Sequence, residues 1–265
     1  MSSPAPNTLN YMVGKGKVYF DRLDTNNLPT GELDLGNDPS FVLTPENETL
    51  EHFSSMEGVK KKDKVAIISS ELNGKFTLDE INIENLCLAL YGEQVEYLNQ
   101  NDGNVNNEAI IAHTGKWVKF TYRKIAQGSV VVTSADGLTI YGENVDYTID
   151  YTIGRIFIII AGNINNNQNL LVDYTYQQAS YPSVYPTTRA QVEGLLRFVG
   201  NNTFGYDYEI VLWHVKLMVN GDLNFISDDW NTIEFSFEGL DDSKNHPNNP
   251  YGMIIDIEGD TAPES

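Results

Sequence analysis

The sequence predicts a mainly β protein: a β-sandwich or barrel with one short helix packed on it and a small β-rich domain inserted into the chain. Three observations predict this architecture. Apolar and polar residues alternate with a period of two along much of the 265 residues. Helical spacing of apolar residues occurs in one segment. The formal charge of −20 is distributed unevenly along the chain.

Charge divides the chain into three parts. Residues 1–100 carry 16 acids and 8 bases, residues 101–190 carry 7 and 6, and residues 191–265 carry 14 and 3. Turn-forming residues and prolines border the middle part at 99–107 and 179–186, which reads as a pair of linkers. We therefore expect a discontinuous main domain, 1–100 with 190–265, and an inserted β-rich surface domain, 101–189.

Strands are expected wherever the alternation is regular. In 232–238, Ile233, Phe235 and Phe237 alternate with polar residues, so these three should face a core. In 65–78 the even positions from Ile68 to Leu78 form the more apolar face. Further strands are expected at 41–53, 192–199 and 209–219 in the main domain, and at 129–133, 138–141, 146–151, 155–160 and 170–176 in the insertion, with turns at 135–137 and 152–154.

The one predicted helix lies between residues 79 and 93 and has about three turns. Its apolar residues fall at helical spacing, at Ile83, Leu86, Cys87 and Leu90. Asp79 or Asn82 would cap its start, and Gly92 occupies the C-terminal cap position.

Composition excludes several classes of function. A charge of −20 argues against a protein that binds nucleic acid by neutralising phosphates, and against one that binds an anionic membrane. The N-terminal sequence has no basic stretch followed by an apolar run, so we expect no secretory signal, and the apolar run at 156–161 is too short for a membrane helix. We expect a soluble protein. The single Cys87 fits folding in a reducing cytoplasm.

No catalytic motif is present. The four histidines, His52, His113, His214 and His246, are dispersed, and the sequence has no HExxH pair, phosphate-binding loop or nucleophile elbow. Carboxylate pairs that a glycosidase needs occur, but they are expected by chance among 37 acids. We predict that the protein is not an enzyme and that it uses no metal or cofactor.

A lysine cluster, Lys60, Lys61, Lys62 and Lys64, is expected in a loop between two strands. On an acidic protein, such a loop is attracted to the acidic surface of a second copy. A solvated hairpin tip is the plainer interpretation.

Around this loop an ordered set of segments resembles the major tail tube protein of tailed bacteriophages of the siphophage type. These segments are GKVYFD at 16–21, GELDLGN at 31–37, TLEHFSS at 49–55, FTLD at 76–79, VEGLLRFVG at 192–200 and GDLNFISDDW at 221–230. The resemblance implies a virion protein of the tail, assembled in the host cytoplasm. Its subunits would form hexameric rings that join their sheets and stack into a tube around the tape measure protein. Tail terminator and distal tail proteins would be further partners, and genomic DNA would pass through without being held.

The resemblance also assigns roles to residues. If the polar strand faces line the lumen, the acids that face inward are Glu46, Glu48, Glu71, Glu193, Glu234 and Glu238, and Lys75 and Arg197 dilute their charge. The loop with Lys60, Lys61, Lys62 and Lys64 would contact the neighbouring ring.

Two other classes of protein fit the sequence. One is a carbohydrate-binding β-sandwich that presents Trp117, Trp213 or Trp230 to a sugar. The other is a different phage structural protein, either a head decoration protein or a tail terminator, which forms a single ring.

Overall fold

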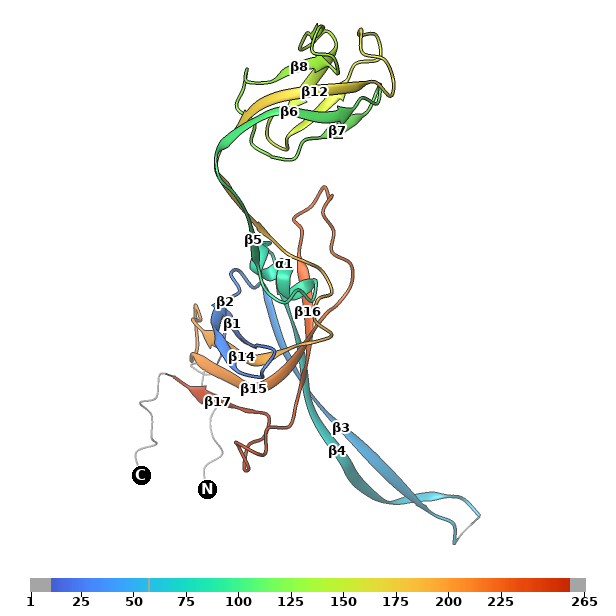
Figure 1. The fold of residues 1–265 in the computed structure, drawn as a ribbon. Coiled ribbons are helices and arrows are strands. Elements are labelled where there is room, and N and C mark those ends of the chain that lie inside the picture. The colour runs from blue at the N-terminus through green and yellow to red at the C-terminus, as the bar shows by residue number, and fades with distance from the viewer. Residues whose placement is uncertain (1–10, 57, 258–265) are drawn as a thin grey trace. The chain divides into compact units, whose positions relative to one another are not determined.

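The computed structural model describes residues 11–56 and 58–257, and the start of the chain, where we expect no secretory signal, lies outside them. Its fold is mainly β, as predicted, with one helix among the described residues (Figure 1). The chain divides into two compact units. Unit 1 comprises Met1–Val95 and Val184–Ser265, and unit 2 comprises Glu96–Ser183.

Unit 1 is built on one antiparallel sheet with the strand order β2-β1-β14-β15-β16-β4-β3. β16 and β17 both pair with the same edge of β15, β17 with its first half and β16 with its second half. The strands are β1 (Gly16–Leu23), β2 (Pro29–Asp34), β3 (Ser40–Ser54), β4 (Lys61–Leu78), β14 (Val192–Gly200), β15 (Tyr208–Val219), β16 (Ile233–Gly239) and β17 (Gly252–Asp256).

The core of unit 1 confirms the alternation predicted for β16. Ile233, Phe235 and Phe237 are each about 1% exposed, while the residues between them face away from the core. The Phe41 ring of β3 stacks on Phe198 of β14 with ring centroids 5.0 Å apart. Because β3 and β14 are not neighbours in the sheet, this contact shows that the sheet folds over on itself around its apolar face.

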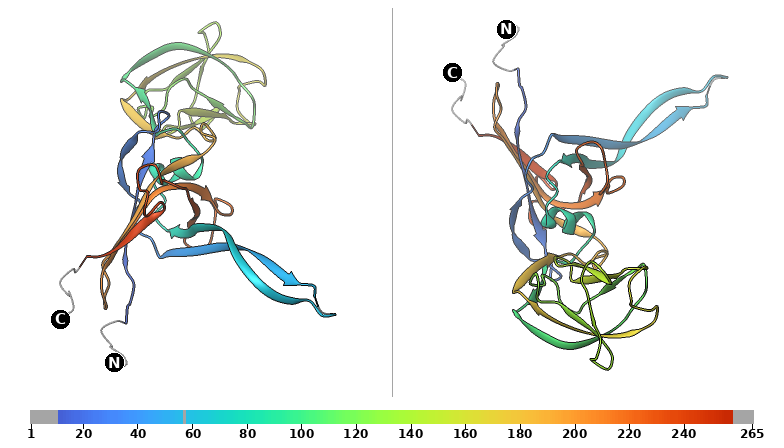
Figure 2. Two further views of the ribbon diagram at one scale, coloured as in Figure 1. Left: turned by 90° about the horizontal axis from the view of Figure 1, so that it is seen from below. Right: turned by 90° about the horizontal axis from the view of Figure 1, so that it is seen from above.

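β4 follows the predicted pattern only in its second half. Gly74, Phe76 and Leu78 are buried, whereas Ile68 is 55% exposed. The reason is that β3 and β4 continue past the sheet as a two-stranded ribbon that projects from the rest of unit 1 in every view (Figures 1 and 2). No second layer covers this ribbon, so alternation there does not produce burial.

Helix α1 (Ile83–Ala89) has seven residues and is shorter than predicted. Asn82 is its N-cap, and the side chain accepts a hydrogen bond from the Asn85 N–H at 2.8 Å. At the other end Tyr91, with φ of 53°, adopts the left-handed conformation, and the Gly92 N–H donates to the Cys87 carbonyl at 2.8 Å. This is a Schellman cap in which Tyr91, not the predicted Gly92, is the left-handed residue. Leu88 and Ala89 join the core of the sheet.

Unit 2 contains three small antiparallel sheets, β6-β12-β8-β9, β10-β11-β7 and β13-β5. Its strands are β5 (Glu96–Gln100), β6 (Gly103–Ile111), β7 (Trp117–Lys119), β8 (Val131–Ser134), β9 (Ile140–Tyr141), β10 (Tyr147–Asp150), β11 (Arg155–Ile158), β12 (Asn169–Tyr176) and β13 (Ala179–Ser183). It has a core of its own, in which Phe120 stacks on Tyr174 with ring centroids 4.9 Å apart.

The expected turns of the insertion are present, but the expected linkers are strands. Gly137 and Gly154 have positive φ angles of 72° and 74°, as the predicted turns at these positions require. Residues 99–107 and 179–186, in contrast, lie largely in β5, β6 and β13. β5 pairs with β13 and β6 pairs with β12. Hydrogen bonds to these partner strands satisfy the backbone N–H and C=O groups of segments whose composition by itself favours turns.

Candidate functional site

The acidic residues singled out from the sequence lie on one face of the unit 1 sheet. Glu46 lies directly opposite Glu71 in the β3/β4 ladder, and Glu48 lies opposite Ser69. Across the central strands, Lys216 lies opposite both Glu193 and Glu238. Because directly opposite residues project to the same side of a sheet, these pairs define a common face.

Register connects the two groups of acids. Glu238 lies opposite Asn73 and Glu234 opposite Thr77, and Asn73 and Thr77 alternate with the core residues Gly74 and Phe76. The face away from the core therefore carries all six candidate acids, which are Glu46, Glu48, Glu71, Glu193, Glu234 and Glu238. We call it the acidic face.

Cations neutralise part of the acidic face. The Lys75 ammonium lies 3.4 Å from the Glu234 carboxylate. Arg197 binds Glu32 at 2.7 Å and also pairs with Glu209. Lys75 and Arg197 were expected here from the sequence.

Two partners of Glu193 were missed by sequence reasoning. His214 Nε2 lies 3.0 Å from a Glu193 carboxylate oxygen, and Lys216 occupies the opposite register position. Both come from β15, and their alternation with Val215 and Leu217 is the signal that could have found them.

The lysine cluster lies where the hairpin turns back. The expectation of a loop is wrong for three of the four lysines, because Lys61, Lys62 and Lys64 begin β4 and Lys60 alone precedes it. Lys62 pairs with Glu51 of β3, and His52 Nδ1 lies 2.6 Å from the Asp63 carboxylate. The cluster is thus held on the outer end of an ordered β ribbon.

The same ribbon exposes large apolar side chains that were not anticipated as a site. Leu50, Ile67 and Ile68 are 63%, 65% and 55% exposed. Leu50 lies opposite Ala66, and Ile67 opposite Thr49, so apolar side chains project from both faces of the ribbon. These exposed apolar side chains make the ribbon a candidate interaction surface.

Within residues 11–56 and 58–257, the sheet of unit 1 ends in open edges at β2 and β3. All six residues of β2 are exposed, and β3 is paired on one side only. An open edge presents unpaired N–H and C=O groups that can pair with a strand of another chain.

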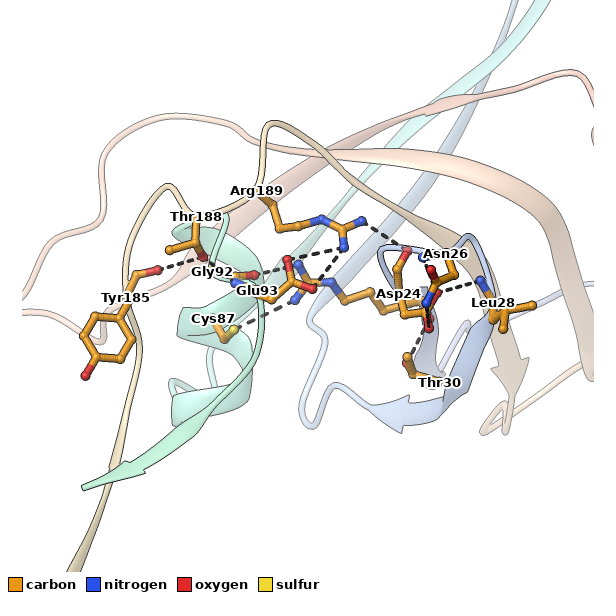
Figure 3. Close-up of polar contacts among 11 residues, drawn as sticks. Asp24, Asn26, Leu28, Thr30, Cys87, Gly92, Glu93, Tyr185, Thr188 and Arg189 are labelled. Atoms are coloured by element: carbon orange, nitrogen blue, oxygen red, sulfur yellow. Dashed lines mark hydrogen bonds and ion pairs between the residues drawn. The ribbon is translucent and has the colours of Figure 1, made fainter. Parts of the chain in front are cut away.

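A cavity of about 300 Å³ lies between α1 and the β1–β2 hairpin. The Arg22 guanidinium of β1 donates to the Gly92 carbonyl at 2.6 Å. Arg189 pairs with Glu93 at 3.2 Å and donates to the Asp24 carbonyl at 3.5 Å, so it ties the segment after α1 to the β1–β2 turn (Figure 3). Cys87 lines this cavity, and burial raises the pKa of its thiol. A protonated thiol is a poor nucleophile.

The three tryptophans of the carbohydrate-binding alternative have different surroundings. Trp117 is in unit 2, and the Arg155 guanidinium lies over its ring at 4.4 Å from the centroid. Trp213 of unit 1 stacks on His246 with ring centroids 4.0 Å apart. Trp230 is 94% exposed in the loop between β15 and β16. Within the described residues, no three His, Cys, Asp or Glu side chains are placed to hold a metal ion.

Residues 11–255 match the family described as "Protein of unknown function UCP028589". The chain belongs to this family. No curated protein matches the chain. In the described part of the chain, no helix has the length and apolar character needed to cross a membrane.

Proposed function

We propose that the protein is the subunit of the tail tube of a tailed bacteriophage. Copies join into hexameric rings, and the rings stack into a tube that encloses the tape measure protein and later conducts DNA. The observation that carries the proposal is an amphipathic sheet with two open edges, one face packed on a core and the other acidic.

Pairing between the open edges of neighbouring subunits would explain both the open edges of the sheet and its acidic face. A closed ring of sheets leaves no unpaired edge, which removes the aggregation risk that β2 and β3 present in the free subunit. The core face of each sheet already packs within its own subunit. The acidic face is therefore the one left to line the lumen.

An acidic wall suits a conduit for DNA. Phosphates are repelled by carboxylates over about one Debye length, roughly 8 Å at physiological salt, so DNA passes without being held. Lys75, Lys216 and Arg197 reduce this repulsion but do not reverse it, because acids outnumber bases on the face.

The β3/β4 ribbon supplies the contact between rings. Its exposed Leu50 and Ile67 and its lysine cluster extend beyond the core of unit 1, where a neighbouring ring can cover them. The two end rings of such a tube each keep one uncovered face, which the tail terminator and the distal tail proteins occupy. Unit 2, folded around its own core, is a surface domain in the virion.

Negative-stain electron microscopy of the purified full-length protein tests the proposal. We expect hollow tubes or six-fold rings. The Lys60→Glu/Lys61→Glu/Lys62→Glu variant is expected to keep the wild-type circular dichroism spectrum yet form no tubes. Wild-type protein that stays monomeric at every concentration and salt tested, even when phage tail tips are added as nuclei, would overturn the proposal. Single rings that never stack would favour a tail terminator instead.

A further inference from the structure

The loop between β15 and β16, residues 220–232, exposes a concentrated apolar surface in unit 1. Phe225, Ile226 and Trp230 are 67%, 90% and 94% exposed. Acids are interspersed among them, at Asp222, Asp228 and Asp229, and all three are exposed. We call residues 220–232 the acidic loop. Large apolar side chains grouped in this way mark an interaction surface.

The turn of the β3/β4 hairpin has the complementary character. Met56 and Val59 are 91% and 72% exposed, and Lys60 and Lys64 follow them on the β4 side. We call residues 55, 56 and 58–64 the hairpin tip. Over residues 11–56 and 58–257, neither Lys60 nor Lys64 forms an ion pair, and the three aspartates of the acidic loop form none either.

These two surfaces lie at opposite ends of the same strand. The hairpin tip leads into β4 at Lys61, whereas the acidic loop leads into β16 at Ile233, which pairs with Leu78 at the far end of β4. An 18-residue strand spans roughly 55 to 60 Å at about 3.3 Å per residue, so the surfaces cannot meet within one subunit. Figure 1 shows the ribbon and the acidic loop extending in opposite directions from the body of unit 1.

We propose that the acidic loop is the docking site for the hairpin tip of a second copy in the next ring. This inference rests on the proposed function and identifies the surface that receives the ribbon. Opposite charge and exposed apolar side chains on both partners provide the complementarity. Two different surfaces at opposite poles make a head-to-tail interface, which repeats indefinitely and builds a filament.

Other acids of unit 1 are placed less well for this role. Asp241 and Asp242 follow β16 at its other end, on the side of the hairpin tip. Asp242 is already engaged, because its carboxylate lies 2.7 Å from His246 Nδ1 and accepts from Asn245 at 2.7 Å. On the acidic face, Glu193, Glu234 and Glu238 lack an adjoining cluster of exposed large apolar residues, and Glu46, Glu48 and Glu71 lie on the two strands that carry the hairpin tip itself.

A charge swap tests the pairing. Lys60→Glu/Lys64→Glu makes the tip acidic, and Asp228→Lys/Asp229→Lys makes the loop basic. Each variant alone should pellet about tenfold less tube than wild type, because tip and loop then carry the same sign. An equimolar mixture of the two should recover tubes, since each tip meets a loop of opposite sign. Asp102→Lys/Asp136→Lys in unit 2 is the matched control and should assemble like wild type.

The outcomes separate the two proposals. If wild-type protein forms neither rings nor tubes, the proposed function fails, and this inference fails with it. If tubes form and the tip variant blocks them, but the loop variant assembles normally or the mixture stays dispersed, only the assignment of the acidic loop is overturned.

A cysteine pair tests the same contact directly. The native Cys87 is 4% exposed and contributes little background crosslinking. Ser55→Cys with Ser227→Cys joins tip to loop, so oxidation of assembled tubes should give a ladder of multimers on a non-reducing gel. Ser55→Cys with Ser243→Cys places the second thiol at the other end of β16 and should give no ladder. Equal ladders from both pairs would contradict the assignment.

Discussion

Glu46 and Glu71 lie directly opposite each other across the β3/β4 ladder, on the same face of the ribbon. Like charges in this position destabilise a sheet by about 0.2 to 1 kcal/mol. The protein therefore carries an unfavourable pair on its acidic face.

Removing one charge of this pair should stabilise the free subunit. We expect Glu71→Gln to raise the free energy of unfolding by roughly 0.2 to 1 kcal/mol at low salt. The gain should shrink at about 1 M salt, where screening removes the repulsion. Urea unfolding at both salt concentrations checks this. Glu48→Gln is the matched control, because Glu48 lies opposite Ser69 and has no like charge across the ladder.

Asp38 should make stability depend on pH. Burial, reinforced by the nearby Asp79 charge, raises the pKa of Asp38 to about 6, and its Oδ2 has no hydrogen-bond partner among the described residues. Because the folded state binds the Asp38 proton more tightly than the unfolded state, the contribution of Asp38 to stability is greatest below its unfolded pKa of about 4 and is lost as pH rises through about 6. The charged carboxylate thus destabilises the subunit at neutral pH.

Asp38→Asn tests this pH dependence. Asparagine keeps an oxygen that can accept from the Ser40 N–H, which donates to Asp38 at 3.1 Å. At pH 7.5 we expect the variant to be more stable by about 1 to 2 kcal/mol, and below pH 4 equal to wild type. Hydrogen exchange of the buried β4 amides in urea, measured across this range, reports the difference for unit 1. Lower stability of the variant than of wild type at pH 7.5 would contradict the prediction that the charged Asp38 carboxylate destabilises the protein.

The core faces of some strands, but not of all, could be predicted from the sequence. Alternation identified the core face of β16, because Ile233, Phe235 and Phe237 pack on a core along the whole strand. The same pattern failed at Ile68, since periodicity indicates two different faces but not whether a second layer covers either one. Whether the acids share a face was also beyond the sequence, because register depends on which strands pair, as with Glu193 and Lys216.

The linkers show the limit of local propensity. Residues 99–107 favour turns by composition, yet Asn99 lies opposite Ser180 and Asn104 opposite Thr175 in antiparallel ladders. Hydrogen bonds to a distant strand satisfied the backbone N–H and C=O groups of this segment and outweighed its local preference for turns.

Unit 2 should fold when it is separated from unit 1. Its ends lie side by side, since Glu96 pairs with Ser183, and its core contains no residue of unit 1. We expect the fragment 96–183 to show a cooperative thermal transition by circular dichroism and dispersed amide resonances. Phe120→Ala should lower its stability by about 3 to 5 kcal/mol, because the ring is 1% exposed.

The full-length chain provides the control for that separation. Phe76→Ala in the full-length protein should destabilise the buried amides of unit 1 by a similar amount and leave those of unit 2 unchanged. Loss of protection in both units from either substitution would contradict independent cores.

If the acidic face lines the lumen, as we propose, its charge should determine whether tubes retain DNA. Glu48→Lys/Glu71→Lys reverses two charges per subunit on the acidic face and places a lysine opposite Glu46, which favours the ladder. Wild-type tubes should not retain short double-stranded DNA, because the wall repels phosphate. Tubes of the variant should retain it, with an affinity that falls steeply as salt rises, as counterion release requires. Cosedimentation of labelled DNA with assembled tubes measures both. The Asp102→Lys/Asp136→Lys tubes carry the same net charge with the reversal in unit 2 and should retain markedly less DNA. If both variants bind DNA equally, net charge and not the acidic face governs retention, and the lumen assignment is wrong.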